Sequence, residues 1–76
     1  MAAVTFVTRQ GCSMCAEAQP VVEQVAAAAA VPLTVLDVDA DPLLDEHSDH
    51  VPVVLLDGVV HSRWWVDEKA LAKALR

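Results

Sequence analysis

The sequence predicts a small α/β protein whose elements follow the order β-α-β-α-β-β-α. Three observations support this fold class. A β-branched run is followed by a long helical pattern and a second apolar run, an Asp-Gly pair separates two further strand-like runs, and the chain ends in an amphipathic pattern. With 76 residues, 55% of them hydrophobic, the chain is expected to form one compact domain, residues 1–76, without linkers or internal repeats.

The first three elements form a βαβ unit. Residues 4–8, VTFVT, are β-branched and aromatic and predict a short strand. Residues 13–30 place valine and alanine side chains on one helical face, which predicts an amphipathic helix. Residues 33–39, LTVLDVD, form a nearly continuous apolar run. This pattern is typical of a strand that is covered on both faces and runs parallel to the first.

The second half of the chain predicts a short helix, a hairpin and a terminal helix. Residues 40–50 are acidic, and Pro42 stands where one or two helical turns can begin, with only Leu43 and Leu44 to bury. The runs VPVVLL and VVHSRWW predict two strands, and the Asp-Gly pair between them predicts an antiparallel hairpin. The last eleven residues begin with acidic and end with basic side chains, as a terminal helix does.

Charge and composition limit the partners that this chain can have. Eleven acidic residues against five basic ones give a net charge of -6, which disfavours nucleic acid and anionic membrane surfaces. The start of the chain, MAAVTFVT, has no secretory signal pattern, and no apolar run is long enough to cross a bilayer. We therefore expect a cytoplasmic monomer. In that reducing compartment a cysteine pair is expected to be catalytic or metal-binding rather than a structural disulfide.

The two cysteines, Cys12 and Cys15, stand in the sequence C-S-M-C between the first strand and the first helix. The amides and positive dipole end of a helix N-terminus stabilise a thiolate, so Cys12 is expected to be the exposed nucleophile. Cys15 is placed to attack a mixed disulfide formed on Cys12, which releases the reduced substrate and leaves a Cys12–Cys15 disulfide. The pattern favours a dithiol-disulfide oxidoreductase without a cofactor over two unreactive thiols.

A zinc site is an alternative use of the cysteines. His47 and His50 form an H-x-x-H pair that offers two further ligands of a tetrahedral site. A predicted helix and a core strand separate Cys15 from His47, whereas small zinc modules place their ligand pairs on short loops or a helix end. We therefore expect no metal, with His47 as a solvated loop residue and His61 as an ordinary strand residue.

The whole chain resembles the thioredoxin superfamily, and its small glutaredoxin-like members in particular. The resemblance rests on C-S-M-C after a first strand, Pro20 five residues beyond the second cysteine, Val51-Pro52 before the third strand, and Asp57-Gly58 after it. It implies a thioredoxin-like fold of the glutaredoxin type: a four-stranded mixed sheet flanked by helices, with the first two strands parallel and the last two antiparallel. It also implies that the Val51-Pro52 bond is cis and that both residues bind an extended peptide or thiol substrate.

Several positions depart from the glutaredoxin pattern. Ser13-Met14 replaces the usual Pro-Tyr beside the nucleophile, where both residues are candidates for substrate binding, and Ser62-Arg63 replaces a glycine pair that holds glutathione. Arg9, three residues before Cys12, is a candidate receptor for an anionic thiol. We expect weak glutathione binding, with protein disulfides or a different low-molecular-weight thiol as the better substrate, and a thiol or a reductase as the electron donor.

A binding module is the competing interpretation. In this case the chain is a redox-silent thioredoxin-like domain or metal carrier, and Met14, Trp64 and Trp65 form a partner surface. For the tryptophans themselves, strand alternation favours another arrangement, in which one packs in the core and its neighbour is half-covered by the terminal helix.

Overall fold

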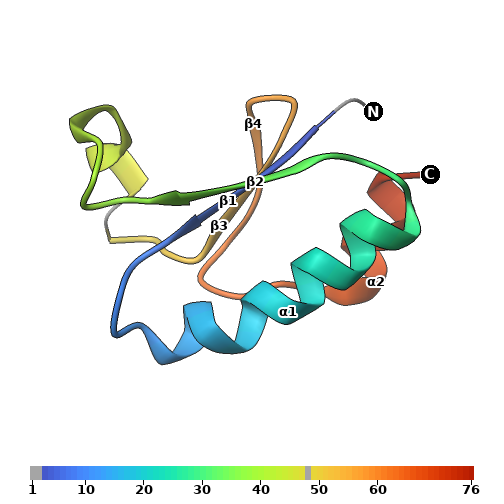
Figure 1. Ribbon diagram of the computed structural model, residues 1–76, viewed down its shortest axis with the longest axis horizontal. Helices are drawn as coiled ribbons and strands as arrows, with labels where there is room; N and C mark the ends of the chain where they lie inside the picture. Colours follow the sequence, from blue (N-terminus) through green and yellow to red (C-terminus); the bar gives the residue numbers. More distant parts are fainter. Residues whose placement is uncertain (1–2, 48) are drawn as a thin grey trace.

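The computed structural model describes residues 3–47 and 49–76, which form a mixed four-stranded sheet and its covering helices (Figure 1). The elements are β1 (Val4–Thr8), α1 (Ser13–Ala28), β2 (Leu33–Asp37), the 3-10 helix η1 (Pro42–His47), β3 (Val53–Leu56), β4 (Val59–Arg63) and α2 (Glu68–Ala74). The strand order in the sheet is β2-β1-β3-β4, with β1 parallel to β2, and β3 antiparallel to both β1 and β4. The predicted element order and mixed sheet are therefore confirmed.

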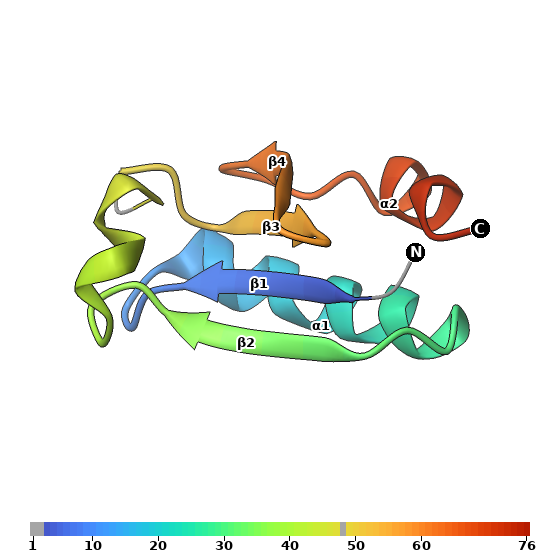
Figure 2. The ribbon, with the colours of Figure 1, turned by 90° about the horizontal axis from the view of Figure 1, so that it is seen from above.

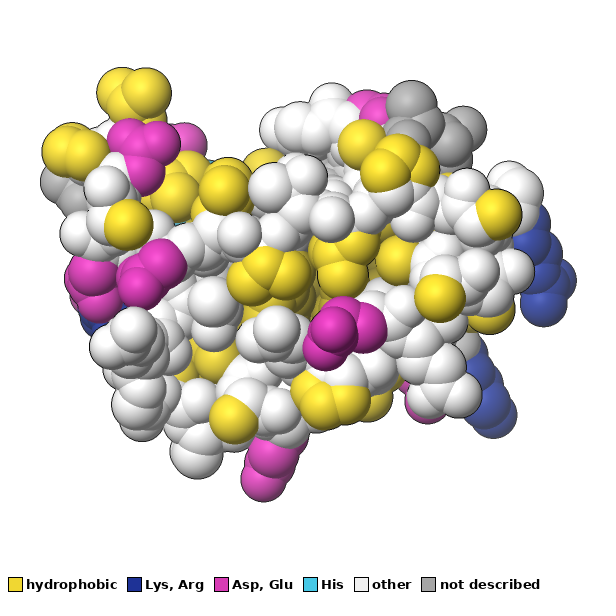
Figure 3. Space-filling model, viewed as in Figure 1, with side chains coloured by type: hydrophobic (Ala, Val, Ile, Leu, Met, Phe, Trp, Pro, Cys, Tyr) yellow, Lys and Arg dark blue, Asp and Glu magenta, His cyan; other side chains and the backbone are white. Residues whose placement is uncertain are grey.

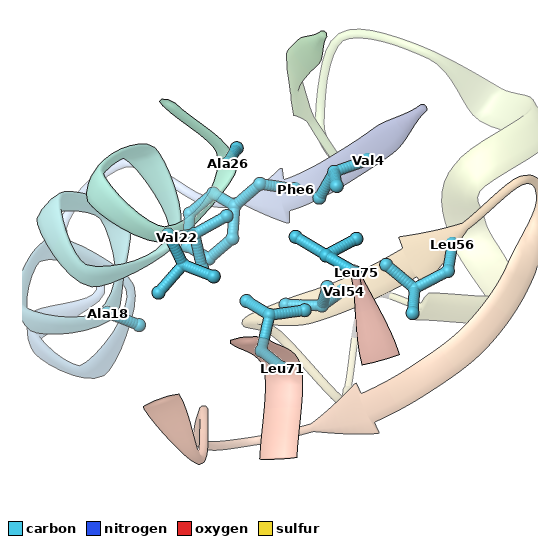
Figure 4. Packing of buried hydrophobic residues seen from close by; sticks show 10 residues of the cluster. Val4, Phe6, Ala18, Val22, Ala26, Val54, Leu56, Leu71 and Leu75 are labelled. Atoms are coloured by element: carbon cyan, nitrogen blue, oxygen red, sulfur yellow. The ribbon is translucent and has the colours of Figure 1, made fainter. Parts of the chain in front are cut away.

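Both α-helices lie on the same face of the sheet (Figures 1 and 2). Residues that pair across strands share a face, so Phe6 of β1 and its partner Val54 of β3 both point towards the helices. Figure 4 shows how side chains of α1 and α2 meet this layer. The buried core cluster consists of Val4, Phe6, Ala18, Val22, Val25, Ala26, Val54, Leu56, Leu71 and Leu75.

The opposite face of the sheet has a smaller core. Val7, Val38 and Val53 are buried there, and Leu44 of η1 packs against them. Its neighbour Leu43 is 85% exposed, so only one of the two leucines that were expected to be buried contributes to the core. The 3-10 helix thus supplies a small apolar cover at one end of this face.

β2 is an edge strand, which corrects one expectation. Its residues Thr34 and Val35 are exposed, Val35 by 42%, so the strand is not covered on both faces. Among the described strands, β1 alone pairs with it. The apolar run indicated a parallel strand correctly, but an edge position leaves side chains uncovered that a central position would bury.

The helices begin and end with identifiable local interactions. α1 continues through Pro20, and beyond its last turn Ala30 adopts φ 57° while the Val31 N–H donates to the Ala26 carbonyl at 3.0 Å. α2 is capped by Asp67, whose carboxylate accepts the Ala70 N–H at 3.1 Å. In the part of the chain that the structure describes, neither helix has the length and apolarity needed to span a membrane.

His47 at the end of η1 is buried, with 9% of its surface exposed, so the expectation of a solvated loop residue is wrong. Its Nε2 lies 3.6 Å from the carboxylate of Glu46. The short helix predicted to begin at Pro42 is present as η1, and the His47 ring at its end is buried rather than solvated. His61 lies in β4 as expected.

Candidate active site

One end of the sheet brings together segments that are far apart in the sequence. β1 and β2 end at the paired residues Thr8 and Asp37, while β3 begins at Val53, which pairs with Val7 and with Arg63 at the end of β4. The loops that follow β1, β2 and β4 and the loop that precedes β3 therefore meet at this end. These loops carry the residues that the sequence marks for chemistry.

The two cysteines occupy different environments although they are three residues apart. Cys12 is the N-cap of α1 and is partly exposed, with an extended backbone of φ −86° and ψ 111°. Cys15 lies one turn inside the helix and is only 1% exposed. The Cys15 N–H donates a hydrogen bond to Cys12 Sγ at 3.2 Å. Gly11, with φ +77°, makes the turn that brings the chain from β1 into this cap.

Burial determines the protonation of the second thiol. The pKa of Cys15 is raised, chiefly because burial disfavours the thiolate and next because of the hydrogen bond to the Cys12 thiol. The Thr8 side chain and the Arg9 backbone act in the opposite direction through their hydrogen bonds to Cys15. The site therefore combines a partly exposed cysteine, whose sulfur accepts a backbone N–H, with a buried cysteine whose thiol has a raised pKa.

The segment before β3 contains the cis-proline that the resemblance implied. The Val51-Pro52 bond is cis, which confirms that expectation, and Pro52 is buried. Val51 is partly buried against the smaller core cluster. Both residues directly precede the strand that pairs with β1, and β1 leads into the cysteine loop.

Trp64 binds this segment through three contacts. Its backbone N–H donates to the His50 carbonyl at 2.9 Å, and its indole Nε1 donates to the Asp49 carbonyl at 3.1 Å. Its ring meets the His50 ring edge-on, with centroids 5.3 Å apart. Trp64 adopts φ +67°, which is unfavourable for a residue with a side chain. Contacts from both its backbone and its ring thus hold the residues immediately before Val51.

The tryptophans are not core residues, which corrects the expected packing. Trp64 is 51% exposed and Trp65 is 64% exposed. Strand alternation does not apply to them, because β4 ends at Arg63 and the left-handed backbone of Trp64 redirects the chain. Both side chains instead line a groove of about 190 Å³ together with Met14 of α1. Glu17, Ala18, Val21 and Val66 complete its walls.

Arg9 lines a second cavity, of about 270 Å³, together with Cys12. Its guanidinium forms a two-pronged contact with the Asp39 carboxylate, from Nε to Oδ2 and from Nη2 to Oδ1, each at 3.0 Å. Ser13 begins α1 next to Cys12 and is exposed. Of the predicted site residues, Arg9 and Cys12 therefore line this cavity, and Met14 lines the groove beside the tryptophans.

Sequence reasoning missed two participants at this end of the sheet. Asp39 follows β2 and pairs with Arg9, and the only signal for it was an acidic residue after a strand parallel to β1. The Trp64 contacts with Asp49 and His50 had no local signal, because they depend on the register of β4. Among residues 3–47 and 49–76, no group of three or more His, Cys, Asp or Glu side chains is arranged to hold a metal ion.

Comparison with known proteins agrees with this architecture. Residues 3–76 match the profile of a family described as "Glutaredoxin-like domain (DUF836)". Uncharacterized proteins of Mycobacterium tuberculosis (strain ATCC 25618 / H37Rv) and Mycobacterium bovis (strain ATCC BAA-935 / AF2122/97) are each 36% identical over 74 residues, covering 90% of this chain and 76% of theirs.

Solved structures share the fold at lower sequence identity. Thioredoxin 1 from Thermosipho africanus TCF52B superimposes with a TM-score of 0.68 at 18% identity, over 96% of this chain and 93% of that one. The thioredoxin-like protein BC3987 in its T8A mutant form gives a TM-score of 0.64 at 19% identity, over 96% and 99%. The fold is thus that of the thioredoxin superfamily, and by the family match and the mycobacterial relatives the chain belongs to the glutaredoxin-like domain family.

Proposed function

We propose that this protein is a thiol-disulfide oxidoreductase in which Cys12 is the nucleophile and Cys15 the resolving thiol. The observation that carries the proposal is the asymmetry of the pair. Cys12 is partly exposed and its Sγ accepts the Cys15 N–H at 3.2 Å, whereas Cys15 is buried and the pKa of its thiol is raised. A substrate disulfide can reach the partly exposed cysteine first, and the buried thiol three residues on can then attack the mixed disulfide.

The reaction consists of two sulfur exchanges. The Cys12 thiolate attacks one sulfur of a disulfide R–S–S–R′, forming Cys12–S–S–R, and R′S⁻ leaves and takes up a proton. The Cys15 thiol then loses its proton and attacks Cys12 Sγ, which forms the Cys12–Cys15 disulfide and releases RS⁻. Two electrons pass from the protein dithiol to the substrate, which becomes two thiols. An external thiol or dithiol reductant must return two electrons to the protein for a second turnover.

Substrate docking is proposed along two neighbouring elements. Val51 and Pro52 provide the extended segment for a peptide or thiol substrate, as the family resemblance implies. Ser13 and Met14 lie between the two cysteines, and Met14 is 45% exposed on the groove that Trp64 and Trp65 also line. An exposed groove with apolar walls favours protein disulfides over very small thiols as substrates, since it offers contact area beyond the sulfur atoms.

The groove also keeps a binding module as the second candidate. A protein that only binds partners would use Met14, Trp64 and Trp65 without exchanging disulfides. The two functions therefore differ in whether the cysteines are required. Under this second proposal, replacing either cysteine by serine would leave partner binding unchanged.

Trapping experiments test the proposed roles of the cysteines. The Cys15→Ser protein should form a stable mixed disulfide with a protein or small-molecule disulfide, because Cys12 attacks and nothing resolves the product. The matched Cys12→Ser protein should trap nothing, since its remaining thiol is buried and protonated. Mass spectrometry of the intact proteins detects the adduct. An adduct on Cys15 would reverse the roles, and the absence of any adduct on either variant would refute the oxidoreductase.

A further inference from the structure

The cation beside the nucleophile is already engaged by a carboxylate of the protein. Arg9 and Cys12 line the same cavity, which also contains Asp37. The guanidinium of Arg9 presents two donors to the two oxygens of Asp39, each at 3.0 Å. This parallel geometry is the one with which arginine binds the carboxylate of a ligand. Asp39 therefore occupies the position that a carboxylate on a substrate would take.

The turn after β2 fixes Asp39 in that position. The Asp39 N–H donates to the Asp37 carboxylate at 2.9 Å, and the Ala40 N–H donates to the Asp37 carbonyl at 3.0 Å. The Val38 N–H donates to the Thr8 carbonyl at 2.8 Å, which ties the turn to the end of β1 directly before Arg9. Asp39 is thus presented to Arg9 by the backbone of two paired strands, so little ordering is needed to form the contact.

The surrounding charge has the same sign as Asp39. Besides Asp39, both Asp37 and Asp49 lie close enough to attract Arg9 electrostatically. In Figure 3, several Asp and Glu side chains gather at the η1 end and others lie elsewhere on this face, while most of the visible Lys and Arg atoms project at the opposite end, where α2 lies. Lys69 and Lys73 belong to α2. A substrate carboxylate that approaches Cys12 would be repelled by these acidic side chains. The guanidinium of Arg9, which could bind it, already binds Asp39.

We propose that Asp39 is a specificity-determining residue of the dithiol site: by holding the guanidinium of Arg9, it excludes disulfides that carry a carboxylate near the sulfur and leaves neutral and cationic disulfides as substrates. This inference rests on the proposed oxidoreductase function. It is specificity by an unfavourable contact with the wrong ligand rather than by an added contact with the right one. The exchange itself proceeds as above, with the protein dithiol oxidised and the small disulfide reduced to two thiols.

A charge series of small disulfides tests the proposal. Reduced protein is mixed with an excess of cystamine, bis(2-hydroxyethyl) disulfide or 3,3′-dithiodipropionate, which are cationic, neutral and anionic. The rate constant for forming the Cys12–Cys15 disulfide is measured after acid quenching and alkylation of the remaining thiols. Each rate is divided by that of dithiothreitol with the same disulfide, which removes differences in intrinsic reactivity. The native protein should prefer cystamine to dithiodipropionate by about tenfold at low salt.

The Asp39→Asn variant should selectively raise the rate constant for the reaction with the anionic disulfide. It should react about fivefold faster than the native protein with dithiodipropionate and within about twofold with the neutral disulfide. Asp41→Asn is the matched control. It removes one charge two residues away, where the carboxylate accepts the Leu43 N–H at 2.9 Å and the Arg9–Asp39 contact is left in place. In the double variant Arg9→Gln/Asp39→Asn, the faster reaction with dithiodipropionate should be lost, because no guanidinium remains to bind its carboxylate.

The outcomes separate the two proposals. If the native protein forms its disulfide with none of the three probes, the oxidoreductase function fails. If the native protein reacts with the neutral disulfide but Asp39→Asn leaves the rate with dithiodipropionate unchanged, the specific role of Asp39 is refuted. An equal increase of that rate in Asp41→Asn would refute it as well. Asp39→Ala provides a second measurement should the asparagine variant fail to fold, because it removes the carboxylate without adding an amide. Circular dichroism establishes that each variant is folded.

Discussion

Replacing Trp64 by phenylalanine tests whether the indole N–H holds the segment that leads into Val51. The phenyl ring can still meet the His50 ring, and the backbone N–H of residue 64 can still donate to the His50 carbonyl. Only the 3.1 Å hydrogen bond to the Asp49 carbonyl is lost. A hydrogen bond of this kind contributes about 1 kcal/mol to the free energy of unfolding. The corresponding fall in Tm is about 5 °C for a domain of this size.

Alanine and glycine at position 64 separate the side chain from the backbone. Trp64→Ala also removes the edge-on ring contact, so the total loss should reach about 2 kcal/mol. Trp64 has φ +67°, which costs a residue with a Cβ about 1–2 kcal/mol relative to glycine. The greater freedom of glycine in the unfolded chain offsets part of this difference. Trp64→Gly should therefore be about 0.5 kcal/mol more stable than Trp64→Ala, the reverse of their order in a helix interior.

Urea denaturation of the reduced proteins, followed by far-ultraviolet circular dichroism, measures these differences. Trp65→Ala is the matched control, because it removes the same side chain from a position that is 64% exposed, and it should cost at most about 0.5 kcal/mol. Hydrogen exchange of the amides around Val51 should accelerate in Trp64→Ala and not in the control. A phenylalanine variant as stable as the native protein, or a glycine variant less stable than the alanine variant, would refute the assigned contacts.

Two further predictions concern Cys15 and Asp67. Burial raises the pKa of Cys15, so the unfolded chain loses this proton first, and the free energy of unfolding of the reduced protein should fall as pH rises above about 8.5. Cys15→Ala should remove this part of the pH dependence in urea titrations, and equal slopes for both proteins would contradict the assignment. Asp67→Ala should cost about 1 kcal/mol because the Ala70 N–H loses its cap, while Asp67→Asn should cost less than half of that in thermal unfolding. An asparagine variant as unstable as the alanine variant would show that the hydrogen bond to the Ala70 N–H does not account for the loss of stability.

The sequence predicted the order of elements because each boundary is marked by local chemistry. Gly11 precedes the cap of α1, Asp57-Gly58 forms the hairpin turn between β3 and β4, and Asp67 caps α2. The run VPVVLL predicts a strand from Val51, whereas β3 begins at Val53. Pro52 has no N–H to donate to a ladder, so the strand begins after it.

The environments of β2, His47 and Arg9 were harder to predict because they depend on tertiary position. An apolar run such as that of β2 can form either an edge strand or a central strand. Val35 is exposed because β2 lies at the edge of the sheet, next to β1. The acidic neighbours of His47 predict a solvated side chain, yet its ring is buried at the end of the 3-10 helix. The partnership of Arg9 and Asp39 spans 30 positions in the chain and follows from the parallel register of β1 and β2.

The spacing of the two cysteines explains why one sulfur is accessible and the other is not. The buried positions of α1 are residues 15, 18, 22, 25 and 26, so Cys15 is the first member of the stripe that faces the core. Cys12 precedes the first helical residue and escapes that stripe as the N-cap. The neighbours of Cys15 in sequence, Met14 and Ala16, are both exposed. A second cysteine at either of these positions would therefore be accessible, so the asymmetry that the proposed exchange requires follows from a spacing of three residues at the start of an amphipathic helix.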